Sequence, residues 1–166
     1  MRVLGIDPGS RHTGYGVVDG DGDRLLTVAC GSVPLPASLP LPARLGRIFT
    51  EISRLIQETH PEEMAVEDVF VSRNARSALI LGQARGAAIA AGIHGGLRVF
   101  EYSALEIKQA VVGYGKADKN QVIHMVRFLL GPPDLSDLHA ADALAVAVCH
   151  IHARTFSRRF RVADRP

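Results

Sequence analysis

An isolated acid ends the first apolar segment of this 166-residue sequence. The segment that begins at Arg2 reads as a short strand, and Pro8 and Gly9 stop it directly after Asp7. A carboxylate at the end of a buried strand is unfavourable unless it has a partner, and a metal ion or phosphate-binding machinery is a common one. The alternative is that Asp7 caps the turn through its own backbone. Asp7 by itself is consistent with either role, in a binding site or as a cap of the turn.

A second acid, Glu67, ends another short buried segment at 64–69. Because side chains alternate across a strand, Glu67 and its neighbour Asp68 point to opposite faces, so one of the two can join Asp7. If the two strands are neighbours in a sheet, the carboxylates of Asp7 and Glu67 emerge at the same edge.

A third contribution comes from a helical segment rich in alanine. His139 and Asp142 are three residues apart, so they stand on one face of that helix. The pair is either a surface hydrogen bond or cap, or a pair of metal ligands. Asp137, near the start of the helix, is explained by the helix dipole.

The elements that position these side chains follow from the hydrophobic pattern. Three strands in succession form an antiparallel meander, and the later strands alternate with helices. This order predicts an α/β fold with a five-stranded mixed sheet and helices on both faces. The expected strands are 2–7, 14–19, 24–33, 64–69 and 97–102, and the expected helices are 45–59, 74–93, 103–110, 117–130 and 136–153.

Length and charge predict one domain with a basic end. The domain covers 1–153, and residues 154–166 read as a disordered tail. The net charge is +2, and the tail contains five Arg and one Asp, so the rest of the chain is negative. Any surface that binds nucleic acid must therefore be a local patch.

Compartment signals point to the cytoplasm. The sequence has no apolar run of membrane-spanning length and no charged-then-apolar signal at its N-terminus. Cys30 and Cys149 form no metal or redox motif, which indicates two reduced thiols.

Four motifs together resemble the RuvC family of Holliday junction resolvases. They are the segments GIDPGSR at 5–11, VEDVF at 66–70, LGQARG at 81–86 and HAADAL at 139–144, and the similarity runs to about His152. The resemblance implies a ribonuclease-H-like fold. It also implies a homodimeric, metal-dependent endonuclease that nicks two strands of a four-way DNA junction and partners the RuvA and RuvB branch-migration proteins.

The resemblance also implies a metal site. Asp7, Glu67, His139 and Asp142 match the family's four metal-binding positions, although well-known members have Asp where this chain has His139. Two Mg²⁺ or Mn²⁺ ions per subunit are expected, with Asp7 bridging them, Glu67 and Asp142 each on one ion, and His139 on the attacking side. The expected product ends are 5′-phosphate and 3′-hydroxyl.

Candidate DNA contacts surround this site. Phe70 either belongs to the core or stacks on an unpaired base near the crossover. The basic candidates are either phosphate contacts or solvated surface charges: Arg73, Arg76, Lys108, Lys116 and Lys119.

A stripe of small residues is the candidate dimer interface. Ala78, Gly82, Gly86 and Ala90 recur every four residues and would let another backbone approach closely. The alternative is that the stripe packs on the protein's own sheet. Two rival functions are an actin-like ATPase, for which the chain is too short, and a junction-binding module without catalysis.

Overall fold

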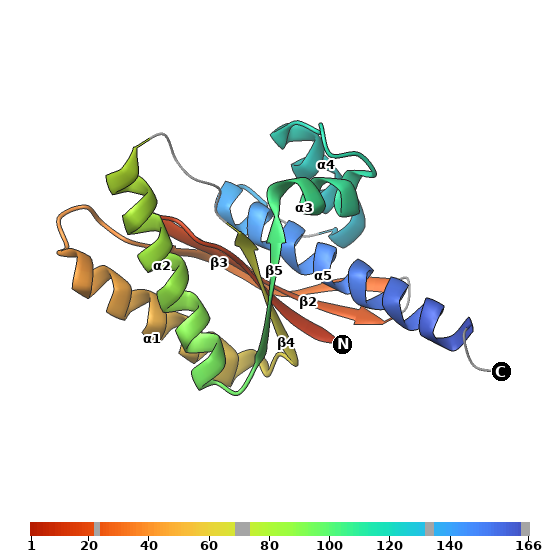
Figure 1. The fold of residues 1–166 in the computed structure, drawn as a ribbon, viewed down its shortest axis with the longest axis horizontal. Coiled ribbons are helices and arrows are strands. Elements are labelled where there is room, and N and C mark those ends of the chain that lie inside the picture. The colour runs from red at the N-terminus through yellow and green to blue at the C-terminus, as the bar shows by residue number, and fades with distance from the viewer. Residues whose placement is uncertain (22–23, 69–73, 132–134, 164–166) are drawn as a thin grey trace.

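The structure, a computed structural model, describes residues 1–21, 24–68, 74–131 and 135–163. Its centre is one sheet with the strand order β3-β2-β1-β4-β5 (Figure 1). β1, β2 and β3 pair antiparallel, whereas β4 and β5 run parallel to β1. The predicted mixed sheet of five strands is therefore confirmed. The strands are β1 (Arg2–Asp7), β2 (His12–Asp21), β3 (Arg24–Pro34), β4 (Glu63–Asp68) and β5 (Arg98–Ser103).

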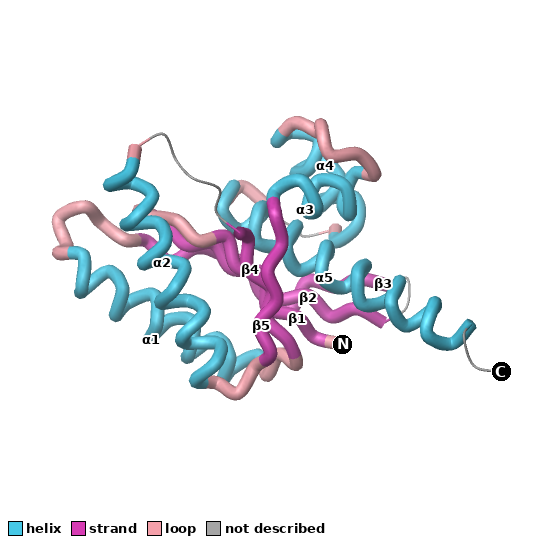
Figure 2. Tube along the Cα trace, in the orientation of Figure 1, coloured by secondary structure: helices cyan, strands magenta, loops and turns pink. Residues whose placement is uncertain are grey.

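Helices cover both faces of the sheet, as predicted (Figures 1 and 2). α1 (Leu41–Thr59) and α2 (Ala75–His94) pack on one face. α3 (Ala104–Val112), α4 (Lys119–Leu130) and α5 (Leu138–Ala163) lie on the other. Strand alternation divides the core accordingly, because Leu4 and Ile6 face α1 and α2 while Val3 faces α5.

Glycines let α5 lie directly on the strands that lead to Asp7. A Cβ on Gly5 would come within 2.1 Å of the Ala143 carbonyl oxygen, and a Cβ on Gly14 would come as close to that of His139. Any larger residue at either position would force the helix away from the sheet. The two glycines therefore set how near the first turns of α5 come to the end of β1.

α5 runs to Ala163 rather than ending near Ala153, so this part of the sequence prediction is wrong. Two side chains just beyond Ala153 have hydrogen-bond partners. Arg154 Nη2 donates to Glu63 Oε1 at 2.9 Å, and Thr155 Oγ1 donates to the Ile151 carbonyl at 2.9 Å. Most of the segment predicted as a disordered tail therefore has a helical backbone.

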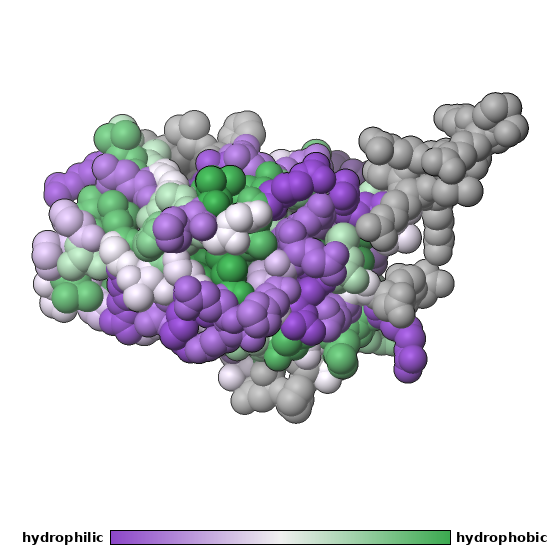
Figure 3. Space-filling model, turned by 90° about the horizontal axis from the view of Figure 1, so that it is seen from below, coloured by the Kyte–Doolittle hydropathy of each residue, from purple (hydrophilic) through white to green (hydrophobic). Residues whose placement is uncertain are grey.

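On the face that Figure 3 shows, many side chains are hydrophilic, and hydrophobic ones lie at the centre and over the left-hand part of the view. Among the described residues, no helix combines the length and the apolar character that crossing a membrane requires.

Candidate active site

Asp7 and Glu67 lie at the same edge of the sheet, as the strand pattern predicts. β1 and β4 are parallel neighbours, and their register pairs Gly5 with Ala65 and Ile6 with Val66. Continuing that register by one residue places Asp7 beside Glu67. Asp68 points elsewhere, since its Oδ1 lies 3.4 Å from Arg85 Nη2 of α2.

The first two turns of α5 bring the other two predicted ligands to this edge. His139 Nδ1 lies 3.2 Å from Asp7 Oδ2. Asp137 fixes the start of the helix, because its Oδ1 accepts a hydrogen bond of 2.9 Å from the His139 backbone N–H. Asp142 lies one turn further along and lines a cavity together with Glu67. The structure thus gathers Asp7, Glu67, His139 and Asp142 at one end of the sheet.

Two lysines border the acids from α3 and α4. Lys119 Nζ donates to Asp142 Oδ2 at 2.7 Å. Lys108 and Lys119 line the same cavity of about 230 Å³ as Glu67 and Asp142. Both carboxylates and ammonium groups therefore line this cavity, which is a suitable environment for a phosphate held by cations.

Asp7 and Glu67 are largely buried, and negative charges of neighbouring carboxylates act on both. Burial raises the pKa of Asp7 to about 6, which the hydrogen bond from His139 opposes and the charge of Asp142 reinforces. Burial also raises the pKa of Glu67 to about 7, and the charges of Asp7 and Asp142 add to that shift. Ionising both Asp7 and Glu67 is therefore unfavourable unless positive charge enters the cluster.

The present side-chain conformations do not form a complete metal site. Across the described parts of the chain, no group of three His, Cys, Asp or Glu side chains is arranged to hold an ion. Asp7 is engaged by His139 and Asp142 by Lys119. The donor set nevertheless fits a divalent cation, because it consists of three carboxylates and one imidazole around a buried excess of negative charge.

The raised pKa of Glu67 predicts how stability depends on pH in metal-free protein. The folded pKa of about 7 exceeds the ordinary 4.5, so the ionised form is disfavoured in the fold. The contribution of Glu67 to the free energy of unfolding is therefore fully present below pH 4.5 and is lost as the pH rises through about 7. With chelator present, we expect the free energy of unfolding of Glu67→Gln to exceed that of wild type by about 1–3 kcal/mol at pH 8. At pH 4.5 the two proteins should show no such difference.

Urea denaturation at the two pH values measures this difference. Glu58→Gln is the matched control, because Glu58 is an exposed acid of α1 that bonds to Arg54. Equal stability of Glu67→Gln and wild type at pH 8 would show that Glu67 ionises without cost.

Of the predicted DNA-binding residues, two line the cavity, two are exposed elsewhere and two lie outside the described residues. Phe70 and Arg73 lie outside the described residues. Arg76 is exposed in the first turn of α2, and Lys116 is exposed in the connection between α3 and α4. Lys108 and Lys119 line the cavity described above, and Lys119 bonds to a carboxylate there.

The small-residue stripe of α2 is largely open to solvent. α2 buries Ala84, Ala88, Ala91 and Gly92, whereas Gly82, Gly86 and Ala90 are exposed and Ala78 is half-buried. A Cβ on Gly82 or Gly86 would meet no atom within 4 Å. Three of the four stripe residues therefore do not pack on the protein's own sheet.

Sequence reasoning missed His12, which contacts a residue of the site. The ring of His12 stacks on that of His139, with 5.2 Å between centroids and 18° between planes. His12 precedes Gly14 by two residues, and Gly14 pairs with Asp7 across β1 and β2. Strand alternation therefore offered a signal, but nothing in the sequence gives the angle at which α5 crosses β2.

Comparison with known sequences identifies one protein family. Residues 3–150 match the family model described as crossover junction endodeoxyribonuclease RuvC. The protein of that name from Methylococcus capsulatus is 57% identical over 165 residues, which cover 99% of both chains. The one from Pelobacter propionicus is 56% identical over 158 residues, covering 95% of this chain and 90% of the relative.

Solved structures give the same result. Thermus thermophilus RuvC in complex with a Holliday junction substrate superposes with a TM-score of 0.89 at 34% identity, covering 95% of this chain and 96% of the other. The yeast mitochondrial Holliday junction resolvase Ydc2 superposes with a TM-score of 0.62 at 15% identity, covering 95% and 83% of the two chains. Because the identity to Ydc2 is 15%, this second comparison shows similarity of the fold alone.

Proposed function

Because the chain belongs to the RuvC family of crossover junction endodeoxyribonucleases, we propose that it resolves four-way DNA junctions with two divalent metal ions per subunit. The observation that carries the metal assignment is the convergence of Asp7, Glu67 and Asp142. These acids come from two strands and a helix, and two of them have strongly raised pKa values. His139 completes the set, as its Nδ1 is turned towards Asp7.

The residues fit this role once two of their present contacts are broken. For cations to bind, Asp7 must release its contact with His139, and Asp142 its contact with Lys119. Asp7 would then bridge the two ions, Glu67 and Asp142 would each hold one, and His139 would bind on the attacking side. When bound, such ions activate a water molecule and neutralise charge on the leaving 3′ oxygen.

The protein's own groups then position the scissile phosphate. Lys119, once released from Asp142, carries a positive charge into the cavity that Lys108 also lines. Both ammonium groups can bind phosphate oxygens and so hold the strand over the carboxylates. Further DNA contacts are proposed for Phe70, Arg73, Arg76 and Lys116.

His139 predicts the preferred metal. Imidazole suits Mn²⁺ better than Mg²⁺, which prefers oxygen ligands, and a site with histidine has one negative charge fewer than one with aspartate. We expect Mn²⁺ to support nicking about fivefold or more faster than Mg²⁺, and His139→Asp to narrow that gap by raising the Mg²⁺ rate. Single-turnover nicking rates in each metal measure the effect. The same preference in both proteins would remove His139 from the ligand set.

A two-fold dimer matches the near two-fold symmetry of a four-way junction. We propose that Gly82, Gly86 and Ala90 form its interface, together with Ala78 at the edge of the stripe. The supporting observation is the open space over Gly82 and Gly86 on an exposed helix face. Branch-migration proteins of the RuvA and RuvB kind are proposed as further partners, and the cytoplasm, where chromosomal DNA lies, as the site of action.

Gly82→Leu is expected to convert the dimer to a monomer at low micromolar concentration. The mutant should keep a wild-type circular dichroism spectrum, because a Cβ at Gly82 would meet no atom of the described part of its own subunit within 4 Å. Gly46→Leu is the control, since Gly46 is an exposed glycine of α1 with equally open surroundings. Analytical ultracentrifugation compares the two. A dimeric Gly82→Leu protein would place the interface elsewhere.

Nick mapping tests the proposed reaction. A junction labelled in turn on each strand should be cut at symmetric positions in two opposing strands, and DNA ligase should reseal the products because they carry 5′-phosphate and 3′-hydroxyl ends. Products that ligase cannot seal, or nicks in one strand only, would contradict the proposal.

A further inference from the structure

We propose that His12 is a positioning residue that holds the ring of His139 against the carboxylates. The inference rests on the proposed function, in which His139 binds a metal ion. It adds a residue outside the four ligands that supports one of them through ring stacking.

The contact restrains His139 from a second direction. Its Nδ1 edge faces Asp7 at 3.2 Å, and one face of its ring is covered by His12 in a nearly parallel stack. The side chain of His139 is 43% exposed, so burial alone does not fix its rotamer. Without His12, the ring would be free to turn towards solvent whenever its bond to Asp7 breaks.

The backbone holds His12 in place for this task. His12 is the first residue of β2 and pairs with Pro34 of β3. On one side, the Leu35 N–H donates to the Arg11 carbonyl at 2.7 Å. On the other side, Thr13 is fully buried. The imidazole of His12 therefore projects from a fixed strand end rather than from a free loop.

Gly14 brings the two histidines within reach. Its missing side chain lets the His139 backbone lie against β2, where a Cβ would be 2.1 Å from the His139 carbonyl oxygen. The same glycine pairs with Asp7 across the sheet. His12, His139 and Asp7 therefore occupy one rigid junction between β1, β2 and α5, which favours a fixed ligand direction before metal binds.

Stacking requires a flat ring at position 12 rather than an imidazole. We expect His12→Ala to weaken Mn²⁺ binding about three- to tenfold, the range that aromatic pairs contribute. His12→Phe should bind Mn²⁺ about as tightly as wild type. His139→Ala should bind more weakly than wild type, and adding His12→Ala to it should cause no further loss.

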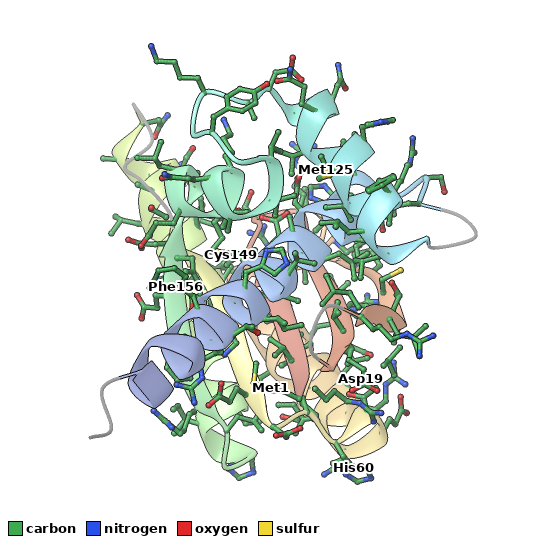
Figure 4. All side chains as sticks on the ribbon, turned by 90° about the vertical axis from the view of Figure 1, so that its right-hand side faces the viewer. Met1, Asp19, His60, Met125, Cys149 and Phe156 are labelled. Atoms are coloured by element: carbon green, nitrogen blue, oxygen red, sulfur yellow. The ribbon has the colours of Figure 1, made fainter. Side chains whose placement is uncertain are left out.

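Electron paramagnetic resonance of free Mn²⁺, titrated with the DNA-free protein, gives these affinities without reference to activity. His60→Asn is the control for loss of a histidine, because His60 ends α1 just before β4 starts at Glu63, whereas Glu67 of the site lies near the other end of β4. Figure 4 shows His60 at the bottom of the view, away from Met125 of α4. His60 has a positive φ of 49°, which asparagine tolerates. Circular dichroism verifies that each variant is folded.

The outcomes separate this inference from the proposed function. Wild-type affinity in His139→Ala would refute the metal role of His139. Weak binding by His139→Ala with wild-type binding by His12→Ala would refute the positioning role alone. A weak His12→Phe, or a further loss in the double variant, would show that His12 acts through its own nitrogens, as a ligand would, and would also overturn the positioning role.

Discussion

Replacing Asp7 with asparagine is expected to slow junction nicking about a thousandfold or more while leaving metal-free junction affinity close to that of wild type. The substitution removes a charge at the point where β1, β4 and α5 meet. Asp7 is the acid proposed to bridge both ions, so both lose a ligand at once. The side chain keeps its size, so the surface that holds DNA is preserved and binding separates from cutting.

Two assays measure this separation. Gel shifts with chelator give junction affinity, and single-turnover nicking in Mn²⁺ gives the rate. Asp19→Asn is the control, because Asp19 lies on β2 opposite Arg2, at the far end of β1, and makes the same acid-to-amide change. Wild-type nicking by Asp7→Asn would end the assignment, and loss of junction binding would mean that Asp7 contacts DNA or supports the fold.

Glu63→Ala is expected to destabilise the protein by about 3 kcal/mol. Glu63 Oε2 lies 2.7 Å from Nε2 of His150, a residue with no exposed surface. Its Oε1 accepts from Arg154 Nη2 at 2.9 Å. Burial lowers the pKa of His150, so the ring is neutral, donating to Glu63 and accepting at Nδ1 from the Tyr102 hydroxyl at 2.7 Å. Removing Glu63 leaves a buried N–H without an acceptor.

Urea denaturation at neutral pH measures this loss. Glu62→Ala is the adjacent control, because it removes an acid whose side chain is 63% exposed and whose hydrogen bond from the Arg2 backbone N–H, 2.9 Å long, is itself exposed. A loss below about 1 kcal/mol for Glu63→Ala would indicate that water replaces the carboxylate and that the network contributes little. Nicking by any folded fraction should be unchanged, because Glu63 starts β4 and Glu67 lies at the other end.

The sequence was sufficient to predict the architecture and the acidic cluster. Alternation along β1 and β4 places Asp7 and Glu67 on one face, and their shared edge follows once the strands are neighbours. The starts of α3 and α4 lie within two residues of the expected ones and depend on equally local contacts, since Ser103 and Asp118 each form a capping box. These features depend on contacts within a few residues or within one strand pair.

Features that depend on how α5 crosses the sheet could not be predicted. The stack of His12 on His139 and the bond from Lys119 to Asp142 each join segments far apart in the chain. The extension of α5 past Ala153 is supported by Arg154, whose partner Glu63 lies 91 residues away. α1 begins at Leu41 rather than at residue 45 as expected, because proline is tolerated in the first turn of a helix.

The most direct test of the account is metal-dependent selectivity for a branched substrate. The protein is incubated with a mobile four-way junction and with linear duplex of the same sequence, each with Mn²⁺, with Mg²⁺ and with chelator. The account predicts paired nicks in the junction with metal, no cutting in chelator, and linear duplex left intact. Cutting of linear duplex at the junction's rate, or nicking of the junction in chelator, would contradict it.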